Sequence, residues 1–456
     1  MRKRTVKILK GIAIAVVVLG VLYAIAVAVS SAKLRKAYAD LEKAGRPMKA
    51  TDVIPKAVPD DENAALLYES AILLLKAQPA SRGLGQPAEQ ENLLNYMGGL
   101  SGTFLTESLE ADKLAELEQL LELDVIYNAL SIIEQGTQRR SCRLDHDYTA
   151  GVNMLLPNLS ELSELTRIFA AKACIEAAAG RPDAAWKLVQ TQLRFADALR
   201  NEPILISQLV RFAMIRTACE TIQKLCEAAP PNAEQYRSVE SLLSDYEDRE
   251  PIILALDGER LLLGEWAFHA LRNGSVKDVT TGTGDESGLG EVLLSLYAAF
   301  KPLLLADHAA YVRIMGELTQ SAQQPYSPNE ASAIDRKIEQ TGSRLHVVTS
   351  MLIPAIGRVK ELYRELIARI HITRAGLAVL QDKKARDAFP QTLESLNLKD
   401  VGDPFSDGPL LYRANPNGFI IYSVGPDQKD NGGSPKEKKE KKETNWDIVW
   451  FYTGER

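Results

Sequence analysis

An apolar segment near the N-terminus constrains this chain more than any other feature. Gly11 to Ala32 reads GIAIAVVVLGVLYAIAVAVSSA and contains no charged residue. Because a helix rises ~1.5 Å per residue, the segment is about 33 Å long and can cross a hydrocarbon core of about 30 Å. We therefore predict a transmembrane anchor over residues 11–32.

The residues before this segment predict its orientation. By the positive-inside rule, a basic tail at residues 1–10 stays in the cytoplasm, so residues 33–456 lie outside the inner (cytoplasmic) membrane. The basic residues are Arg2, Lys3, Arg4, Lys7 and Lys10. The small residues Ala26-Val27-Ala28 also fit signal-peptide cleavage, which would make the chain a secreted protein. We favour the uncleaved anchor, since secretory apolar regions are usually ~7–15 residues long.

Charge separates the two parts of the chain. The 456 residues carry a formal net charge of −6, of which the first 32 residues contribute +5 and the remainder −11. An acidic exported part argues against a nucleic-acid partner. No later stretch reaches 18 apolar residues, so the sequence predicts a single membrane span. The expected partners are the membrane and a protein of the cell envelope.

Most of residues 33–342 has helical periodicity, with apolar residues recurring at intervals of three and four. Short breaks such as Gly180-Arg181-Pro182 and Pro230-Pro231 place successive helices antiparallel. We predict a mainly α-helical extracytoplasmic domain, an irregular antiparallel array of helical hairpins. A polar, mobile loop is expected at about 273–291, followed by one helix to about Leu318.

Residues 343–456 combine a long helix with strands. The helix is expected from about Ser343 to Ala385, and Pro354 predicts a kink or a helix start near residue 353. The pattern then alternates with period two, which predicts short strands at 411–413, 419–422 and 448–451. The first two strands are joined by a turn sequence, Asn415-Pro416-Asn417-Gly418, and the charged insert 436–443 (KEKKEKKE) precedes the third.

This C-terminal part resembles the globular half of the type II secretion major pseudopilins. The resemblance covers about Arg369 to Tyr452, and its motifs are Phe389-Pro390, Asp403-Pro404-Phe405, Leu411-Tyr412, Tyr422-Ser423-Val424-Gly425-Pro426-Asp427 and Asp430-Asn431-Gly432-Gly433. The overall layout also resembles uncharacterised membrane-anchored helical proteins of bacteria that carry such a module. The pseudopilin resemblance implies a small α+β fold with a β-meander. It also implies a calcium site in the final loop, held by Asp427, Asp430, Asn431 and Asp447.

The four cysteines, Cys142, Cys174, Cys219 and Cys226, lack the CxxC spacing of zinc ribbons and redox motifs. Cys219 and Cys226 lie on one helical face about 10 Å apart, too far for a mutual disulfide. We predict that all four are small core residues, with disulfides to other elements left open.

Catalytic motifs are missing from the sequence: it contains no G-x-S-x-G, Walker A, HExxH or G-x-G-x-x-G. The densest polar cluster is Asp145-His146-Asp147. Two readings fit it: His146 and Asp147 form an acid/base or metal pair in a groove, or Asp147 caps a helix or pairs with an Arg. Gln208 and Arg211, on an apolar helix, line the same groove or cross-link neighbouring helices.

Two functions therefore remain open at this stage. The first is a membrane-anchored extracytoplasmic interaction or scaffold protein whose C-terminal module is stabilised by calcium. The second is a cell-envelope hydrolase or ligand-binding protein with a groove near Asp145–Asp147. The sequence favours the first, because no catalytic motif supports the second.

Overall fold

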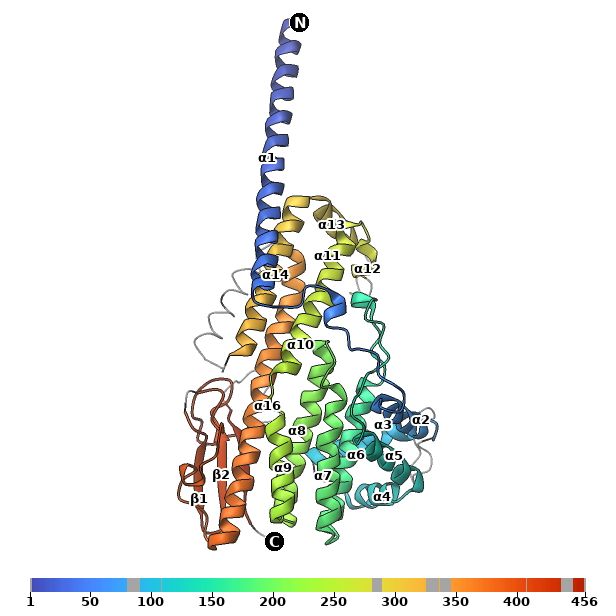
Figure 1. Ribbon diagram of the computed structural model, residues 1–456, viewed down its shortest axis with the longest axis vertical. Coiled ribbons are helices and arrows are strands. Elements are labelled where there is room, and N and C mark those ends of the chain that lie inside the picture. The colour runs from blue at the N-terminus through green and yellow to red at the C-terminus, as the bar shows by residue number, and fades with distance from the viewer. Residues whose placement is uncertain are drawn as a thin grey trace.

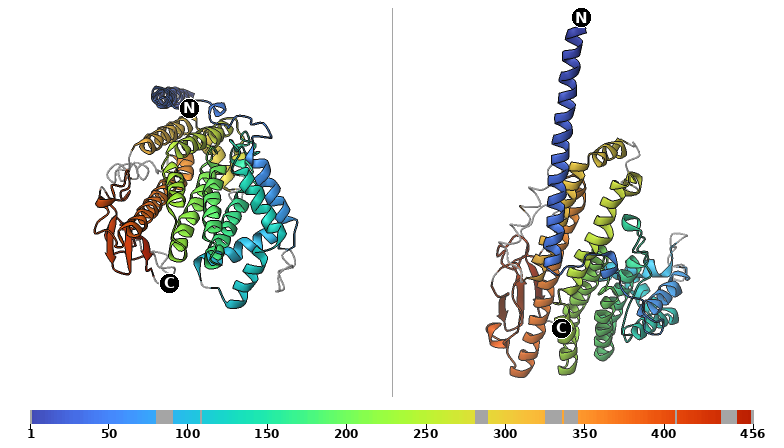
Figure 2. Two further views of the ribbon diagram at one scale, coloured as in Figure 1. Left: turned by 60° about the horizontal axis from the view of Figure 1, so that its bottom comes forward. Right: turned by 45° about the horizontal axis from the view of Figure 1, so that its top comes forward.

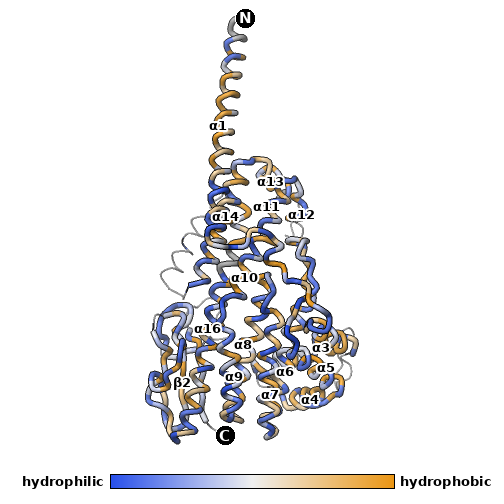
Figure 3. Tube along the Cα trace, in the orientation of Figure 1, coloured by the Kyte–Doolittle hydropathy of each residue, from blue (hydrophilic) through white to orange (hydrophobic). Residues whose placement is uncertain are grey.

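The apolar N-terminal segment is part of one continuous helix, α1 (Arg2–Lys43), in the computed structural model (Figure 1). Residues 2–79, 91–107, 109–280, 289–324, 336, 346–406, 408–435 and 446–454 are described. Within them, α1 is the single unbroken helix long and apolar enough to cross a membrane. Its apolar half projects away from the rest of the chain, as the hydropathy colouring of Figure 3 shows.

The body beside α1 is mainly helical, which confirms the predicted helical architecture at this level. Its first helices are α2 (Ala64–Lys76), α3 (Leu93–Thr106), α4 (Ala111–Leu121), α5 (Asp124–Gly136), α6 (Leu159–Ala178) and α7 (Pro182–Ala196). The following ones are α8 (Leu205–Ala228), α9 (Ala233–Asp245), α10 (Glu250–Gly258), α11 (Glu265–Arg272), α12 (Val276–Thr280), α13 (Leu289–Ala299), α14 (Lys301–Gln323) and α16 (Val347–Arg386). A π-helical turn, Glu259–Gly264, joins α10 to α11.

One hydrophobic core runs through these helices. Gly180, with a φ of 75°, ends α6, and the hairpin it makes lets α6 and α7 pack against each other and against α8. The largest side chains buried there are Trp186, Phe169, Phe195 and Tyr246. The α2–α5 group and the β-sheet lie on opposite sides of these central helices (Figure 2).

The helix predicted to end near Leu318 is two helices. Phe300 leaves the helical conformation, and α13 and α14 meet there at 95°. Pro302 lies in the first turn of α14, where the missing N–H costs nothing. The apolar pattern continues across the bend, which is why the periodicity alone predicts one helix.

The long C-terminal helix differs from its prediction at Pro354. α16 begins at Val347 and continues through Pro354 to Arg386, so no helix starts near residue 353. Asp307 of α14 caps this start: its carboxylate accepts hydrogen bonds from the Val348 and Thr349 amides, at 2.8 and 3.1 Å. Because a charged cap satisfies these amides, α16 begins about two turns before the proline.

Two predicted segments lie partly outside the described residues. In the polar stretch 273–291, α12 forms at its start and α13 at its end, and residues 281–288 are not described. The charged insert 436–443 is also not described. The residues that flank it lie side by side, since the Asp447 amide donates to the Ser434 carbonyl at 2.7 Å.

The predicted strands form an antiparallel sheet of order β1-β2-β3, namely β1 (Leu411–Asn415), β2 (Gly418–Ser423) and β3 (Ile448–Tyr452). In its register, Tyr412 faces Ile421 and Ile421 faces Trp450. The Asn415 side chain accepts hydrogen bonds from the Asn417 and Gly418 amides, both at 2.9 Å. An Asx turn therefore joins β1 to β2, as the turn sequence predicts.

The sheet packs directly on α16. Trp450 of β3 is buried against Gly376. A Cβ at residue 376 would lie closer to the indole ring than real Cβ contacts ever come. Phe419 adds an edge-to-face contact with Trp450 at 5.4 Å between ring centroids. Gly376 thus permits the close approach that attaches the sheet to the helix.

All four cysteines are free thiols, and none is fully exposed. Cys219 and Cys226 belong to the core, and Cys142 and Cys174 are half-buried against it. Burial raises the pKa of Cys142 and Cys219 to about 12, with the Glu202 carboxylate adding to the effect at Cys142. The prediction of small core residues holds for Cys219 and Cys226, whereas Cys142 and Cys174 lie at the edge of the core.

A polar cluster joins α1 to the body. The Tyr38 hydroxyl lies 2.8 Å from both Glu265 carboxylate oxygens and 3.2 Å from His308 Nε2. His308 Nε2 is in turn 2.9 Å from Glu265 Oε2. Below this cluster, Arg46 at the end of α1 pairs with the buried Asp257.

We expect Gly376→Ala to destabilise the C-terminal module. The added methyl group must displace Trp450, and overpacking of this kind costs about 1–3 kcal/mol. Chemical unfolding of the full chain in detergent, followed by tryptophan fluorescence, measures the loss. Gly99→Ala in α3 is the matched control, because its new methyl group meets no atom within 4 Å. Equal stability of the two variants would contradict the described attachment of the sheet.

Candidate functional site

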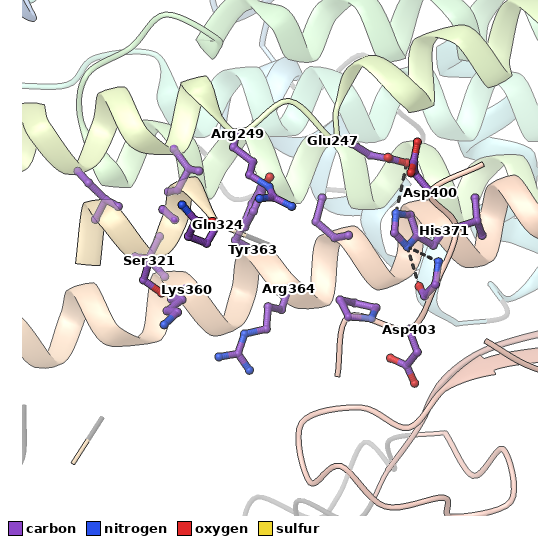
Figure 4. Close-up of a pocket in the computed structure, with 18 of the residues that line it drawn as sticks. Glu247, Arg249, Ser321, Gln324, Lys360, Tyr363, Arg364, His371, Asp400 and Asp403 are labelled. Carbon is purple, nitrogen blue, oxygen red and sulfur yellow. Dashed lines mark hydrogen bonds and ion pairs between the residues drawn. The ribbon is translucent and has the colours of Figure 1, made fainter. Parts of the chain in front are cut away.

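A cleft of about 700 Å³ lies where the helical body meets the C-terminal module (Figure 4). Helices α10, α14 and α16 form its walls together with the segment 398–404. Its apolar lining includes Ile252, Leu256, Leu318, Val359, Ile367, Leu398 and Val401. A volume of this size is within the usual range for ligand pockets.

One face of α16 supplies the longest wall. The lining residues follow the spacing of a helix face, which turns each of them toward the same side. They are Val359, Lys360, Tyr363, Arg364, Ile367 and His371. α16 therefore takes part in two contacts: its residues 359–371 line the cleft, and Gly376 packs against the sheet.

Asp403 holds the opposite wall in place. This carboxylate is buried and accepts hydrogen bonds from the Phe405 amide at 2.9 Å, the Ser423 hydroxyl at 2.6 Å and the Val424 amide at 2.9 Å. The bonds tie the segment before β1 to the end of β2. They also explain why the Asp403-Pro404-Phe405 and Tyr422-Ser423-Val424 motifs occur together.

His371 connects the cleft to an ion-pair network at one end. Its Nε2 lies 3.3 Å from Glu247 Oε1, and its Nδ1 lies 2.7 Å from the Gly402 carbonyl oxygen. Arg374, one turn further along α16, pairs with Glu247 and with Glu240 at 2.7 Å. Burial opposes ionisation of Glu247, but the hydrogen bond and charge of His371 and the charge of Arg374 outweigh it. The pKa of Glu247 is consequently lowered.

Tyr363 lies in the middle of the cleft wall. Its hydroxyl is buried and has no hydrogen-bond partner among the described residues. Burial raises the pKa of Tyr363 to about 12, so the hydroxyl is a proton donor at neutral pH. The Arg364 guanidinium lies beside it on α16, 5.8 Å from the centre of the Phe405 ring. The cleft thus offers an apolar surface together with the Tyr363 hydroxyl as a donor and basic side chains.

The structure separates the residues of the predicted Asp145–Asp147 groove. Asp145 and Asp147 are exposed, whereas His146 is buried between them. Asp147 accepts hydrogen bonds from the Thr149 amide and hydroxyl, at 3.0 and 2.6 Å, in a local turn. His146 points the other way, with Nδ1 3.2 Å from Glu202 Oε2. The chain alternates sides at this point, so His146 and Asp147 do not form a pair.

Gln208 and Arg211 cross-link elements rather than line a groove with Asp147. The Gln208 side chain donates to the carbonyls of Leu199 and Glu202, at 2.7 and 3.1 Å. It therefore lies beside the His146 partner, Glu202. Arg211 pairs with Asp197 at 3.2 Å and stacks over the Tyr246 ring.

Glu202 is the residue that organises this buried cluster. Besides His146, it accepts a hydrogen bond from the Tyr148 hydroxyl at 2.9 Å. Burial, reinforced by the Glu202 carboxylate, raises the pKa of Tyr148. The sequence gives no signal for Glu202, because its partners lie more than 50 residues away along the chain.

The residues of the expected calcium site lie in one loop. Asp447 is buried and accepts hydrogen bonds from the Gly433 and Ser434 amides, at 2.7 and 3.3 Å. The Asn431 side chain donates to Asp427 at 2.9 Å. Asp430 accepts from the Tyr422 hydroxyl at 3.1 Å. The oxygens suit calcium chemically, but the hydrogen bonds direct them at protein donors instead of one common point.

No group of three or more His, Cys, Asp or Glu side chains arranged to hold a metal was found in the part of the chain that the structure describes. Comparisons with protein-family models, curated proteins and solved structures gave no match to this chain.

We expect Glu247→Gln to reduce stability and to change its response to acid. Removing one anion from the His371–Arg374 network costs about 1–3 kcal/mol at pH 7. In the wild type the ionised Glu247 stabilises the fold fully above the ordinary glutamate pKa of 4.5. This stabilisation is lost as the pH falls through the lowered pKa of Glu247. The variant lacks this loss, so its unfolding midpoints from pH 7 to pH 3 decline less steeply.

Glu220→Gln is the control for this series. Glu220 pairs with Arg216 and with Arg369, both at 3.8 Å, and its side chain is 43% exposed; such long, partly exposed pairs contribute little. A Glu220→Gln effect as large as that of Glu247→Gln, or parallel acid profiles for wild type and Glu247→Gln, would contradict the assigned role of the network.

Proposed function

We propose that this chain is a membrane-anchored extracytoplasmic interaction protein that holds a polypeptide segment of an envelope partner in the cleft. In this proposal α1 is the anchor, residues 1–10 face the cytoplasm, and the body lies outside the inner membrane. The observation that carries the proposal is the cleft itself. It combines an extended apolar wall with the unpartnered Tyr363 hydroxyl.

The packing of α1 supports an uncleaved anchor. Ser30, Leu34, Ala37 and Leu41 are buried, and α1 packs along α14. The contact extends to Tyr23, whose ring lies 5.5 Å from that of Phe300. Cleavage near Ala28 would remove Tyr23 and leave Phe300 without this contact, so the intact helix suits the body better than a shortened one.

The ionisable groups around the cleft favour binding over hydrolysis. His371 and Glu247 are bonded to each other, and Asp403 is held by three protein donors. A hydrolytic groove at Asp145–Asp147 has no geometric support, because both aspartates face away from His146. The cleft instead suits an apolar peptide segment that accepts a hydrogen bond from Tyr363.

The C-terminal module supports a scaffold role of the same kind. Its three strands form an antiparallel sheet of order β1-β2-β3, and the proposal takes this sheet as a pseudopilin-like β-meander. We propose in addition that the loop of Asp427, Asp430, Asn431 and Asp447 binds calcium, which requires Asp427 and Asp430 to turn toward the ion.

Photo-crosslinking in native membranes tests the cleft. A photoreactive amino acid at Val401, in the cleft wall, is expected to give a defined adduct with a partner protein, and one at the exposed Tyr127 of α5 is not. Ala322→Trp narrows the cleft and is expected to abolish the Val401 adduct. Equal adducts at both positions, or an adduct that persists with Ala322→Trp, would count against partner binding in the cleft.

Thermal unfolding with and without calcium tests the loop. If an ion binds the folded chain, calcium raises the Tm of EGTA-treated protein, and Asp427→Asn removes the increase. Asp400→Asn, an exposed acid of the same module, is the control and keeps it. An identical Tm in EGTA and in calcium would exclude the ion, whereas Asp447→Ala lowers stability in both conditions by leaving buried amides without an acceptor.

A further inference from the structure

Helix α13 presents an apolar face that no described part of the chain covers. Val292, Leu293, Leu296 and Phe300 are exposed by 55%, 58%, 66% and 47%. We refer to these four residues as the α13 face. The opposite side of α13 is attached to the body: Leu294 is buried, and the Tyr297 hydroxyl donates to Asp307 at 2.8 Å. The exposed side is therefore fixed in its orientation.

The direction of α13 follows from its neighbours. α14 packs lengthwise along the outer half of α1, and α13 meets α14 at 95° (Figure 1). Hence α13 lies across the axis of α1. If α1 crosses a membrane along its normal, α13 runs parallel to the membrane plane.

The level of α13 along α1 is set by one contact. Phe300 lies at the junction of α13 and α14 and touches Tyr23. Tyr23 belongs to the apolar segment, nine residues or about 14 Å before its end at Ala32. α13 is thus level with a point near the middle of the predicted membrane span, on its outer side.

We propose that the α13 face inserts into the outer leaflet of the same membrane, so that α13 lies among lipid beside α1. The proposal rests on the proposed role of α1 as the anchor. Its occupant is the acyl chains and the glycerol region of the lipid. Between Glu291 and Lys301 the chain carries no charge; Glu291 lies in the first turn of α13, and Lys301 lies beyond its end.

Continuity with the anchor favours lipid over a protein partner. The α13 face and the exposed apolar side of α1 near Tyr23 lie next to each other, joined by the Tyr23–Phe300 contact. A bilayer around α1 at this level must also surround α13.

Fluorescence quenching by brominated lipids tests the proposal on the full chain. The reporters are Leu296→Trp on α13, Phe300→Trp at the junction of α13 and α14, Val18→Trp on α1 and Leu73→Trp on α2. Each is reconstituted in phosphatidylcholine vesicles with or without brominated acyl chains. The signal of the parent chain, with its four tryptophans, is subtracted. We expect the Val18, Leu296 and Phe300 reporters to be quenched and the Leu73 reporter, exposed by 62% on the body, not to be.

Each possible pattern of quenching either supports or overturns the proposed insertion of the α13 face. Quenching at Val18 without quenching at Leu296 and Phe300 would overturn the proposal while leaving the anchor intact. No quenching at Val18 would mean that the anchor itself, and with it the proposed function, is wrong. Quenching at Leu296 that disappears as the protein-to-lipid ratio rises would show that a second copy covers the face, and would also overturn the proposal.

Discussion

The packing of the outer half of α1 on α14 determines how the rest of the structure is placed. Ser30, Leu34, Ala37 and Leu41 form a stripe on α1, with Leu41 lying against Gly316 of α14. Apolar stripes alone allow helices to slide by a turn at small cost. Here the Tyr38 hydroxyl, shared between Glu265 and His308, fixes one register, because a slip would leave this partly buried hydroxyl without its partners.

The same junction contains buried charges, which carry a desolvation cost unless they are paired. Asp257 and Arg260 are almost fully buried, and Asp257 contacts both Arg260 and Arg46, which follows the end of α1. Arg260 also donates to the Pro47 carbonyl, just after α1 ends. Burial opposes ionisation of Glu265, but its bonds to His308 and Tyr38 outweigh this and lower its pKa. The junction therefore combines fixed geometry with charges that are stable only when α1 is in place.

The sequence predicted the features that depend on local pattern and missed those that depend on distant partners. Periodicity identified the helices and the three strands, and the Asn415–Gly418 turn was correct. The bend at Phe300 was missed because apolar residues continue on both sides of it. His146 and Gln208 were chosen as site residues, but Glu202, which brings them together, lies 56 residues from His146. The cleft was missed altogether, since α14, α16 and the 398–404 segment meet only in the folded chain.

The length of α16 has a consequence for the geometry of the whole protein. Its start is capped by Asp307, two turns from the α13 junction, and Gly376 holds the sheet 29 residues further on, or about 44 Å. In the proposed orientation α16 is a rigid spacer that sets the height of the cleft and the sheet above the lipid surface. A partner must then extend to that height. The length of the partner's chain and the chemistry of the cleft therefore both determine which partner can bind.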